Sequence, residues 1–168
     1  MNPRESDSGA KSVNDADVVE LTITDAGELL TLQRAAYVTE AQLHDDVSLP
    51  ALTQSLLDLL TELSNSAVHA WGIRVGGRLV ASMRIRVDRD VAEVMRLVVA
   101  PDMQGRGMGT RLLAAVDSVI PENVTRVELF TGERSVANIR LYERMGYREI
   151  RRRDTGPYDL VYLARYRD

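Results

Sequence analysis

Hydrophobic and polar positions change their spacing along the chain, and each change marks a predicted element. Val18 to Thr22 has the alternation of a short strand, and the next residues have helical spacing that places Leu29, Leu32 and Ala36 on one face. After a loop, Ser48 and Pro50 suit the start of a second helix. That helix is predicted to run over residues 49–63, where its leucines form a mostly core-facing apolar stripe.

From Val68 onward the spacing becomes that of strands. Two alternating runs are separated by Gly76-Gly77, a dipeptide typical of a two-residue hairpin loop. The return strand alternates apolar residues with Ser82, Arg84 and Arg86. We therefore expect one face of this strand to be buried and the other to be polar.

The second half of the chain contains strand and helix patterns in turn. The predicted elements are a strand at 91–99, a helix after the glycine-rich loop and before Pro121, a strand at 126–131, a helix at 135–145, and strands at 147–152 and 160–164. Antiparallel strands followed by strand–helix–strand units predict an α/β domain of the α+β type, with a mixed sheet and helices on its faces.

Composition limits the class of protein. Residues 1–16 are polar and have almost nothing to bury, which predicts a disordered leader followed by one domain over 17–168. Hydrophobic residues make up 45% of the chain, yet no run is long enough for a membrane span, and we expect a cytoplasmic protein. A net charge of −4 argues against nucleic-acid binding and favours a cationic partner such as an amine.

Metal and thiol chemistry find no support in the sequence. The chain has no cysteine, which excludes disulfides and thiolate ligands. His44 and His69 have no ligand partners at helical or hairpin spacing, so we predict no metal site. Arg151-Arg152-Arg153 reads as a solvated strand end, although it could also meet a phosphate.

The glycine-rich stretch after residue 99 carries the chemistry. A strand runs through Pro101 into glycines at alternate positions and then directly into an amphipathic helix. Glycines let successive N–H groups point into one concavity, and the helix N-terminus adds its dipole, so the segment is suited to a pyrophosphate. It is neither a Walker loop, because Thr110-Arg111 follows Gly109, nor a dinucleotide fingerprint, because the third glycine comes one position early.

This segment resembles motif A of the GNAT superfamily of N-acetyltransferases. The family pattern Gln/Arg-x-x-Gly-x-Gly/Ala is met by Gln104, Gly107 and Gly109, after a strand that ends in Val99-x-Pro101. A later family motif is met by Asn138, Leu141, Tyr142, Gly146 and Tyr147. The resemblance covers most of residues 18 to 165. It implies a mostly antiparallel central sheet of six to seven strands flanked by about four helices.

The resemblance also implies a donor and the residues that hold it. Acetyl-CoA would be the cofactor, with CoA as product, and a backbone N–H near Val98–Val99 would stabilise the oxyanion. Tyr142 would donate a proton to the leaving thiolate, although its helical spacing also fits a core residue. The residues implied to bind CoA are Leu97, Val98, Val99, Gln104, Gly105, Arg106, Gly107, Met108, Gly109, Thr110, Asn138 and Tyr142.

Two carboxylates are candidates for the general base. Glu93 lies where the histone-acetylating branch of the family places its catalytic glutamate, and Glu128 matches a position where other branches place an acid. The acceptor would be an amine on a small molecule or at a peptide N-terminus. The residues implied to read the acceptor are Tyr37, Glu40, His44, Asp45 and Asp46.

Alternative functions remain open at the level of sequence. One keeps the fold and uses a longer acyl-CoA in a pocket beside Met83 and Met95. Another is a CoA-binding sensor or interaction module without turnover. The resemblance also allows a homodimer, since dimers are frequent in the family.

Overall fold

The computed structural model describes residues 16–168, so all but the last residue of the leader predicted at 1–16 lies outside the described residues. Ala16, the last residue of that prediction, is buried in the hydrophobic core. The elements are β1 (Val18–Leu21), a short 3-10 helix (Ile23–Asp25), α1 (Ala26–His44), α2 (Pro50–Thr53), α3 (Leu56–Leu63), β2 (Val68–Val75), β3 (Arg78–Asp88), β4 (Val91–Val99), a second 3-10 helix (Pro101–Met103), α4 (Met108–Val119), β5 (Arg126–Gly132), α5 (Val136–Arg144), β6 (Arg148–Asp154) and β7 (Asp159–Tyr166).

The strands form one sheet in the order β1-β2-β3-β4-β5-β7-β6. Every neighbouring pair is antiparallel except β4 and β5, which are parallel. The β2–β3 hairpin turns at Gly76 and Gly77, whose φ angles of 57° and 81° suit a two-residue loop between strands that twist together. The predicted mixed, mostly antiparallel sheet of the α+β type is confirmed, with seven strands.

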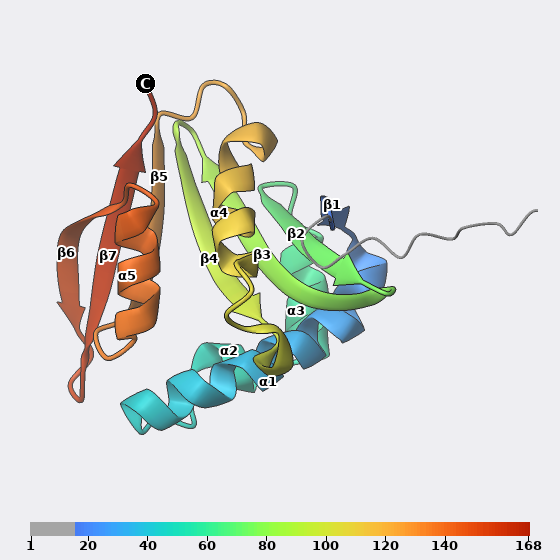
Figure 1. Ribbon diagram of the computed structural model, residues 1–168, viewed down its shortest axis with the longest axis horizontal. Helices are drawn as coiled ribbons and strands as arrows, with labels where there is room; N and C mark the ends of the chain where they lie inside the picture. The colour runs from blue at the N-terminus through green and yellow to red at the C-terminus, as the bar shows by residue number, and fades with distance from the viewer. Residues whose placement is uncertain (1–15) are drawn as a thin grey trace, which may run out of the picture.

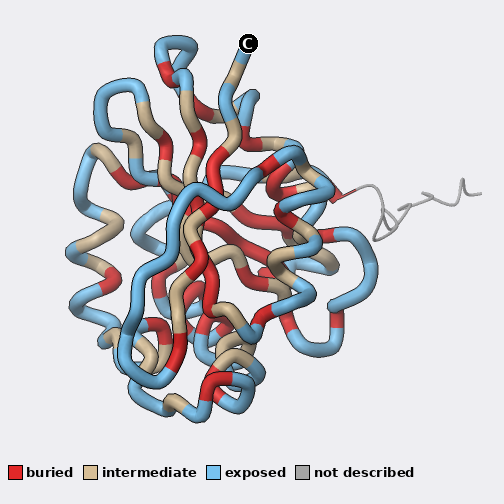
Figure 2. Tube along the Cα trace, turned by 90° about the vertical axis from the view of Figure 1, so that its left-hand side faces the viewer, coloured by how far each residue is buried: buried red, intermediate tan, exposed pale blue. Residues whose placement is uncertain are grey.

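Helices cover both faces of the sheet (Figure 1). α4 lies on one face of β2, β3 and β4, and α1 and α3 pack on the other face. α5 stands beside β5 and β7 on the same side as α4. Buried positions follow the central strands in Figure 2, whereas β6 forms an edge at which all residues are exposed. No helix in the described part of the chain is long and apolar enough to cross a membrane.

The single helix predicted over residues 49–63 is wrong, because the segment forms α2 and α3 with a break between them. Ser55 begins the second helix with a capping box, in which its Oγ accepts the Asp58 N–H at 3.1 Å and the Asp58 carboxylate accepts the Ser55 N–H at 3.0 Å. The apolar stripe is also less buried than predicted. Leu59 is fully buried, but Leu56, which belongs to the same predicted stripe, is 46% exposed.

The predicted polar face of β3 is wrong as well, since Ser82 and Arg84 are each only 1% exposed. Both lie beneath the helices on that face, and Arg84 remains paired there. Its Nε donates to Glu62 Oε1 at 2.9 Å and its Nη2 to Gln33 Oε1 at 2.8 Å. Burial lowers the pKa of the Arg84 guanidinium, while Glu62 acts in the opposite direction. The pair thus anchors α1 and α3 to the sheet.

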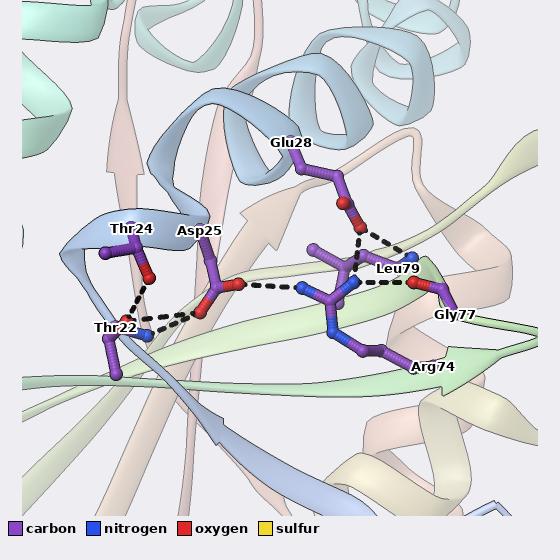
Figure 3. A network of polar contacts seen from close by, with 7 residues as sticks. All are labelled: Thr22, Thr24, Asp25, Glu28, Arg74, Gly77 and Leu79. Carbon is purple, nitrogen blue, oxygen red and sulfur yellow. Dashed lines mark hydrogen bonds and ion pairs between the residues drawn. The ribbon is translucent and has the colours of Figure 1, made fainter.

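The N-terminal end of α1 is fixed by a second arginine (Figure 3). Arg74 donates to Asp25 and to Glu28, each at 2.8 Å, and to the Gly77 carbonyl of the hairpin. Glu28 also accepts the backbone N–H of Leu79 at 2.7 Å. The start of α1 is therefore fastened to the tip of the β2–β3 hairpin.

The C-terminal end of α1 is fixed by His44, which packs on the end of β5. The His44 Nδ1 donates to the Glu40 carbonyl at 3.0 Å, and its Nε2 accepts the Arg134 N–H at 3.2 Å. A Cβ built on Gly132 would lie 2.1 Å from that Nε2. Glycine is thus required at position 132 because the imidazole ring occupies the space of a side chain.

Gly132→Ala is expected to destabilise the fold by about 1–3 kcal/mol, because the added methyl group overlaps the His44 ring. His44→Ala removes the overlap, so the two changes together should cost at least about 1 kcal/mol less than the sum of the single changes. Chemical denaturation of the four proteins measures this coupling. Gly27→Ala in α1, where a Cβ meets nothing within 4 Å, is the matched control and should not destabilise. Additive losses at 132 and 44 would contradict the assigned contact.

Candidate active site

The parallel pairing of β4 with β5 is short, and the site begins where it stops. Only Val91–Glu93 pair with Arg126–Glu128. Beyond that point β4 stays paired with β3 as far as Val99, and β5 stays paired with β7 as far as Gly132. The two strands diverge toward α1 in Figure 1. Their facing edges carry backbone groups without a strand partner, and an extended ligand can pair with such an edge.

A bulge in β4 shapes this edge. Met95 pairs with Arg84 and Val98 with Ser82, so two residues of β4 oppose one residue of β3. One of the two is Arg96, which has a φ of 51°. A left-handed conformation is uncommon for a residue with a Cβ, and nothing in the sequence signals it.

The free groups of β4 near its end point toward β5. The Ala100 N–H donates to the Val80 carbonyl at 2.7 Å, on the β3 side. Because successive residues of a strand alternate in direction, the N–H and carbonyl of Val99 point to the opposite side. Of these two groups, the carbonyl accepts a hydrogen bond from Gln104 Nε2 at 3.4 Å.

The glycine-rich loop joins this edge to α4. Gly105 and Gly107 have φ angles of 74° and 76°, and Gly107 is the N-cap of the helix. A Cβ at either glycine meets nothing within 4 Å, so the backbone there is open to a ligand. The first intrahelical bond runs from the Arg111 N–H to the Gly107 carbonyl. The N–H groups before Arg111 are therefore available for an anion.

These elements surround one cavity of about 1200 Å³ between the separated strands. Most of the residues predicted to bind CoA line it, and Arg106 does not. Those on the wall are Leu97, Val98, Val99, Gln104, Gly105, Gly107, Met108, Gly109, Thr110, Asn138 and Tyr142. Met95 also lines the cavity, whereas Met83 is fully buried and is not part of its wall.

Helices α1 and α5 approach each other across this cavity. Glu40 on α1 accepts a short hydrogen bond from Ser135 Oγ and one from Asn138 Nδ2 at 3.3 Å. Ser135, Asn138 and Tyr142 have the spacing of one helical face, as Tyr37, Glu40 and His44 do on α1. The two faces therefore place polar side chains opposite each other on the wall of the cavity.

Tyr142 is the phenol at the centre of this arrangement. It is 5% exposed, and its ring lies 6.4 Å from that of Tyr147 between centroids. Burial raises the pKa of Tyr142 well above its usual range, and Tyr37 and Glu40 raise it further. The phenol is therefore protonated at neutral pH and is suited to donate a hydrogen bond.

Only some of the residues expected to recognise the acceptor lie on the cavity wall. Tyr37, Glu40 and His44 all line the cavity. Asp45 and Asp46 do not, since Asp45 ends α1 in a left-handed conformation and Asp46 accepts the Tyr158 hydroxyl at 2.9 Å.

The two candidate bases sit side by side where the strands are still paired. Glu93 and Glu128 are direct partners in the β4–β5 register. Each is held by an arginine: Glu93 by a short contact with Arg86, and Glu128 by Arg126 at 2.9 Å. Glu93 lines both the main cavity and a smaller neighbouring pocket, whereas Glu128 lines the smaller pocket alone. The structure thus separates two residues that the sequence treats alike.

Three polar residues in and beneath the wall are absent from the sequence interpretation. Ser135 binds Glu40, Glu62 holds the buried Arg84, and Arg96 occupies the bulge. An arginine inside the otherwise apolar run of residues 94–99 was the available signal for Arg96. The Ser135 contact joins segments 95 residues apart and has no local signature.

Comparison with solved structures places this geometry among known acetyltransferase folds. The ribosomal-protein-S18-alanine N-acetyltransferase of Escherichia coli superposes with a TM-score of 0.73 at 22% identity, covering 89% of this chain and 92% of that one. The PaiA N-acetyltransferase of Thermoplasma acidophilum, solved in complex with coenzyme A, gives a TM-score of 0.70 at 17% identity, covering 88% and 97%. At these identities the likeness concerns the fold.

Sequence comparison finds two relatives and one family model. The YqkA protein of Bacillus subtilis is 28% identical over 126 residues, which are 75% of this chain and 35% of that protein. An uncharacterized N-acetyltransferase of Methanocaldococcus jannaschii is 37% identical over 62 residues, 36% of this chain and 27% of the relative. The chain thus spans about a third or less of the length of these curated relatives. The model of the acetyltransferase (GNAT) family matches residues 29–147, and with the open strand edge and the glycine loop inside that match, the chain belongs to the GNAT acetyltransferase family.

Proposed function

We propose that this chain transfers the acetyl group of acetyl-CoA directly to a primary amine of an acceptor. The observation that carries the proposal is the open edge of β4, which runs into a glycine-rich helix N-terminus within the cavity that holds the protonated Tyr142. Membership of the GNAT family supports the acetyl donor. The coenzyme A in the Thermoplasma acidophilum structure supports the same donor.

We assign the donor to the side of the cavity formed by β4 and α4. The backbone of Leu97, Val98 and Val99 would pair with the amide groups of the pantetheine arm, as another strand would. The N–H groups of the Gln104–Gly109 loop, with Thr110, would hold the pyrophosphate at the helix N-terminus. Asn138 would contact CoA from the opposite wall.

The transfer needs three contributions from the protein, which are stabilisation of an oxyanion, a proton for the leaving thiolate and a base for the amine. The amine nitrogen forms a bond to the thioester carbonyl carbon, and a β4 N–H near Val98–Val99 stabilises the oxyanion that results. The carbon–sulfur bond then breaks, and the Tyr142 hydroxyl donates to the departing thiolate. A carboxylate accepts the proton that the amine loses, and this proton returns through water to the Tyr142 oxygen. The products are therefore an amide and the CoA thiol, and both side chains regain their starting protonation states.

For the proton acceptor we propose Glu93, acting through water, in preference to Glu128. Both carboxylates are ion-paired, but Glu93 is the one of the two on the wall of the main cavity. The contact with Arg86 would hold its carboxylate in place.

The first experiment measures thiol release from acetyl-CoA with a panel of polyamines, amino acids, aminoglycosides and peptide N-termini. We expect turnover with at least one class of amine, together with CoA binding detected by calorimetry. Tight CoA binding without turnover on any amine would mean that the chain is a CoA-binding module and not an enzyme. Turnover only with longer acyl-CoA donors would mean that the transferred group is a longer acyl group and not an acetyl group.

Tyr142→Phe is expected to lower kcat by about a hundredfold while CoA affinity changes little, because the lost hydroxyl acts on the leaving thiolate. Tyr147→Phe is the matched control, because Tyr147 is also a buried tyrosine and it is not on the cavity wall. Steady-state kinetics and CoA calorimetry on both variants separate the effects. An equal loss of kcat and of CoA affinity in Tyr142→Phe would refute the role of proton donor.

The pair Glu93→Gln and Glu128→Gln tests the base. Since a general base contributes about 10²–10⁴-fold, we expect Glu93→Gln to lower kcat by at least about a hundredfold. Glu128→Gln should retain most of kcat. The reverse outcome would assign the base to Glu128, and an unchanged kcat in both variants would exclude the two carboxylates together.

A further inference from the structure

The charges on the cavity wall do not match a simple cationic acceptor. Two wall carboxylates are ion-paired with arginines of the protein, Glu62 with Arg84 and Glu93 with Arg86. Wall arginines without a carboxylate partner within the described residues are Arg96, Arg134, Arg144 and Arg153. The negative net charge of the chain is thus not reproduced at the site.

Arg96 is the one of these arginines that lies in the strand edge itself. Its backbone is held in a left-handed conformation by the β4 bulge, a conformation that costs energy for a residue with a side chain. Its Nε is buried and has no hydrogen-bond partner in the described structure. Among the described residues the guanidinium donates a hydrogen bond to the Tyr37 hydroxyl. Because one phenol uses only part of its five N–H donors, the guanidinium keeps donor capacity for a ligand at the wall of the cavity.

The neighbours of Arg96 place it on the acceptor side. Its Cζ lies 5.9 Å from the ring centroid of Tyr37, which belongs to α1 and not to the glycine loop. Tyr37 is one helical turn from Glu40, and both also act on Tyr142. Arg96, Tyr37 and Glu40 thus surround the part of the cavity next to the proposed proton donor.

From this arrangement we infer that the acceptor is an amine that also carries an oxyanion, a carboxylate or a phosphate, which Arg96 binds. A guanidinium presents parallel N–H donors that match two oxygens of such a group. Glu40, on the same wall, offsets the repulsion that the ammonium end would meet from the arginines. The inference rests on the proposed acetyl transfer and names the chemical class of its acceptor.

A different role for Arg96 would change the kinetics in a different way. If Arg96 stabilised the tetrahedral oxyanion, it would act on the bond-forming step with every amine alike. If it bound an oxyanion of the acceptor, it would act only on acceptors that carry one. Substrate pairs that differ in the anionic group separate these roles.

The experiment compares kcat/KM within two such pairs: amino acids against their decarboxylated amines, and phosphoethanolamine against ethanolamine. We expect the anionic member of at least one pair to be preferred by about a hundredfold, and the preferred pair identifies carboxylate or phosphate. Arg96→Gln should reduce this preference to near unity, and Arg96→Lys should restore part of it. Arg140→Gln, which removes an exposed arginine away from the cavity, should leave the preference unchanged.

Calorimetry with CoA alone shows whether the Arg96 variants keep a folded donor site. Equal kcat/KM within both pairs, or an equal fall for both members in Arg96→Gln, would overturn the inference while leaving acetyl transfer intact. Absence of thiol release with every amine would instead count against the proposed function itself.

Discussion

The site depends on one constraint, which is that β4 and β5 stop pairing after three residues. An inner strand of a sheet normally forms backbone hydrogen bonds along both of its edges. β4 and β5 lack these bonds with each other beyond Glu93 and Glu128, although both are inner strands. Each is held in place from its other side, β4 by β3 and β5 by β7. The sheet therefore holds together although these backbone groups have no strand partner. Every residue assigned to the donor lies on or next to the gap between the two strands.

Closure of the opening comes from helix α1, which is fastened at both ends. Arg74 holds its start to the β2–β3 hairpin, and His44 holds its last turn against Gly132 on the far half of the sheet. Between these points Tyr37 and Glu40 face α5 across the cleft. The helix thus sets the distance between the two halves of the sheet and carries acceptor-side groups at the same time.

Local patterns in the sequence were sufficient for most of the fold. Gly76-Gly77 predicted its hairpin because the turn requires positive φ angles, and the glycine loop with the helix behind it predicted an anion site for the same reason. At Ser55 the local signal is a Ser-x-x-Asp capping pattern, which starts a new helix inside one apolar stripe. The alternation of polar and apolar residues in β3 predicts an exposed Arg84, and this prediction is wrong. A strand covered on both faces can bury an arginine if helices bring Glu62 and Gln33 to it. The bulge at Arg96 and the Glu40–Ser135 contact depend on tertiary structure and leave no local pattern.

The last strands bear on how the molecule behaves at high concentration. β6 ends the sheet, and an edge strand with free backbone groups can recruit another chain and start aggregation. Here all seven residues of that strand are exposed, four of them are arginines, and a register shift interrupts its pairing between Glu149 and Arg151. Bringing two such edges together would place like charges in contact and oppose strand addition. Charge on this edge thus serves solubility, whatever the acceptor proves to be.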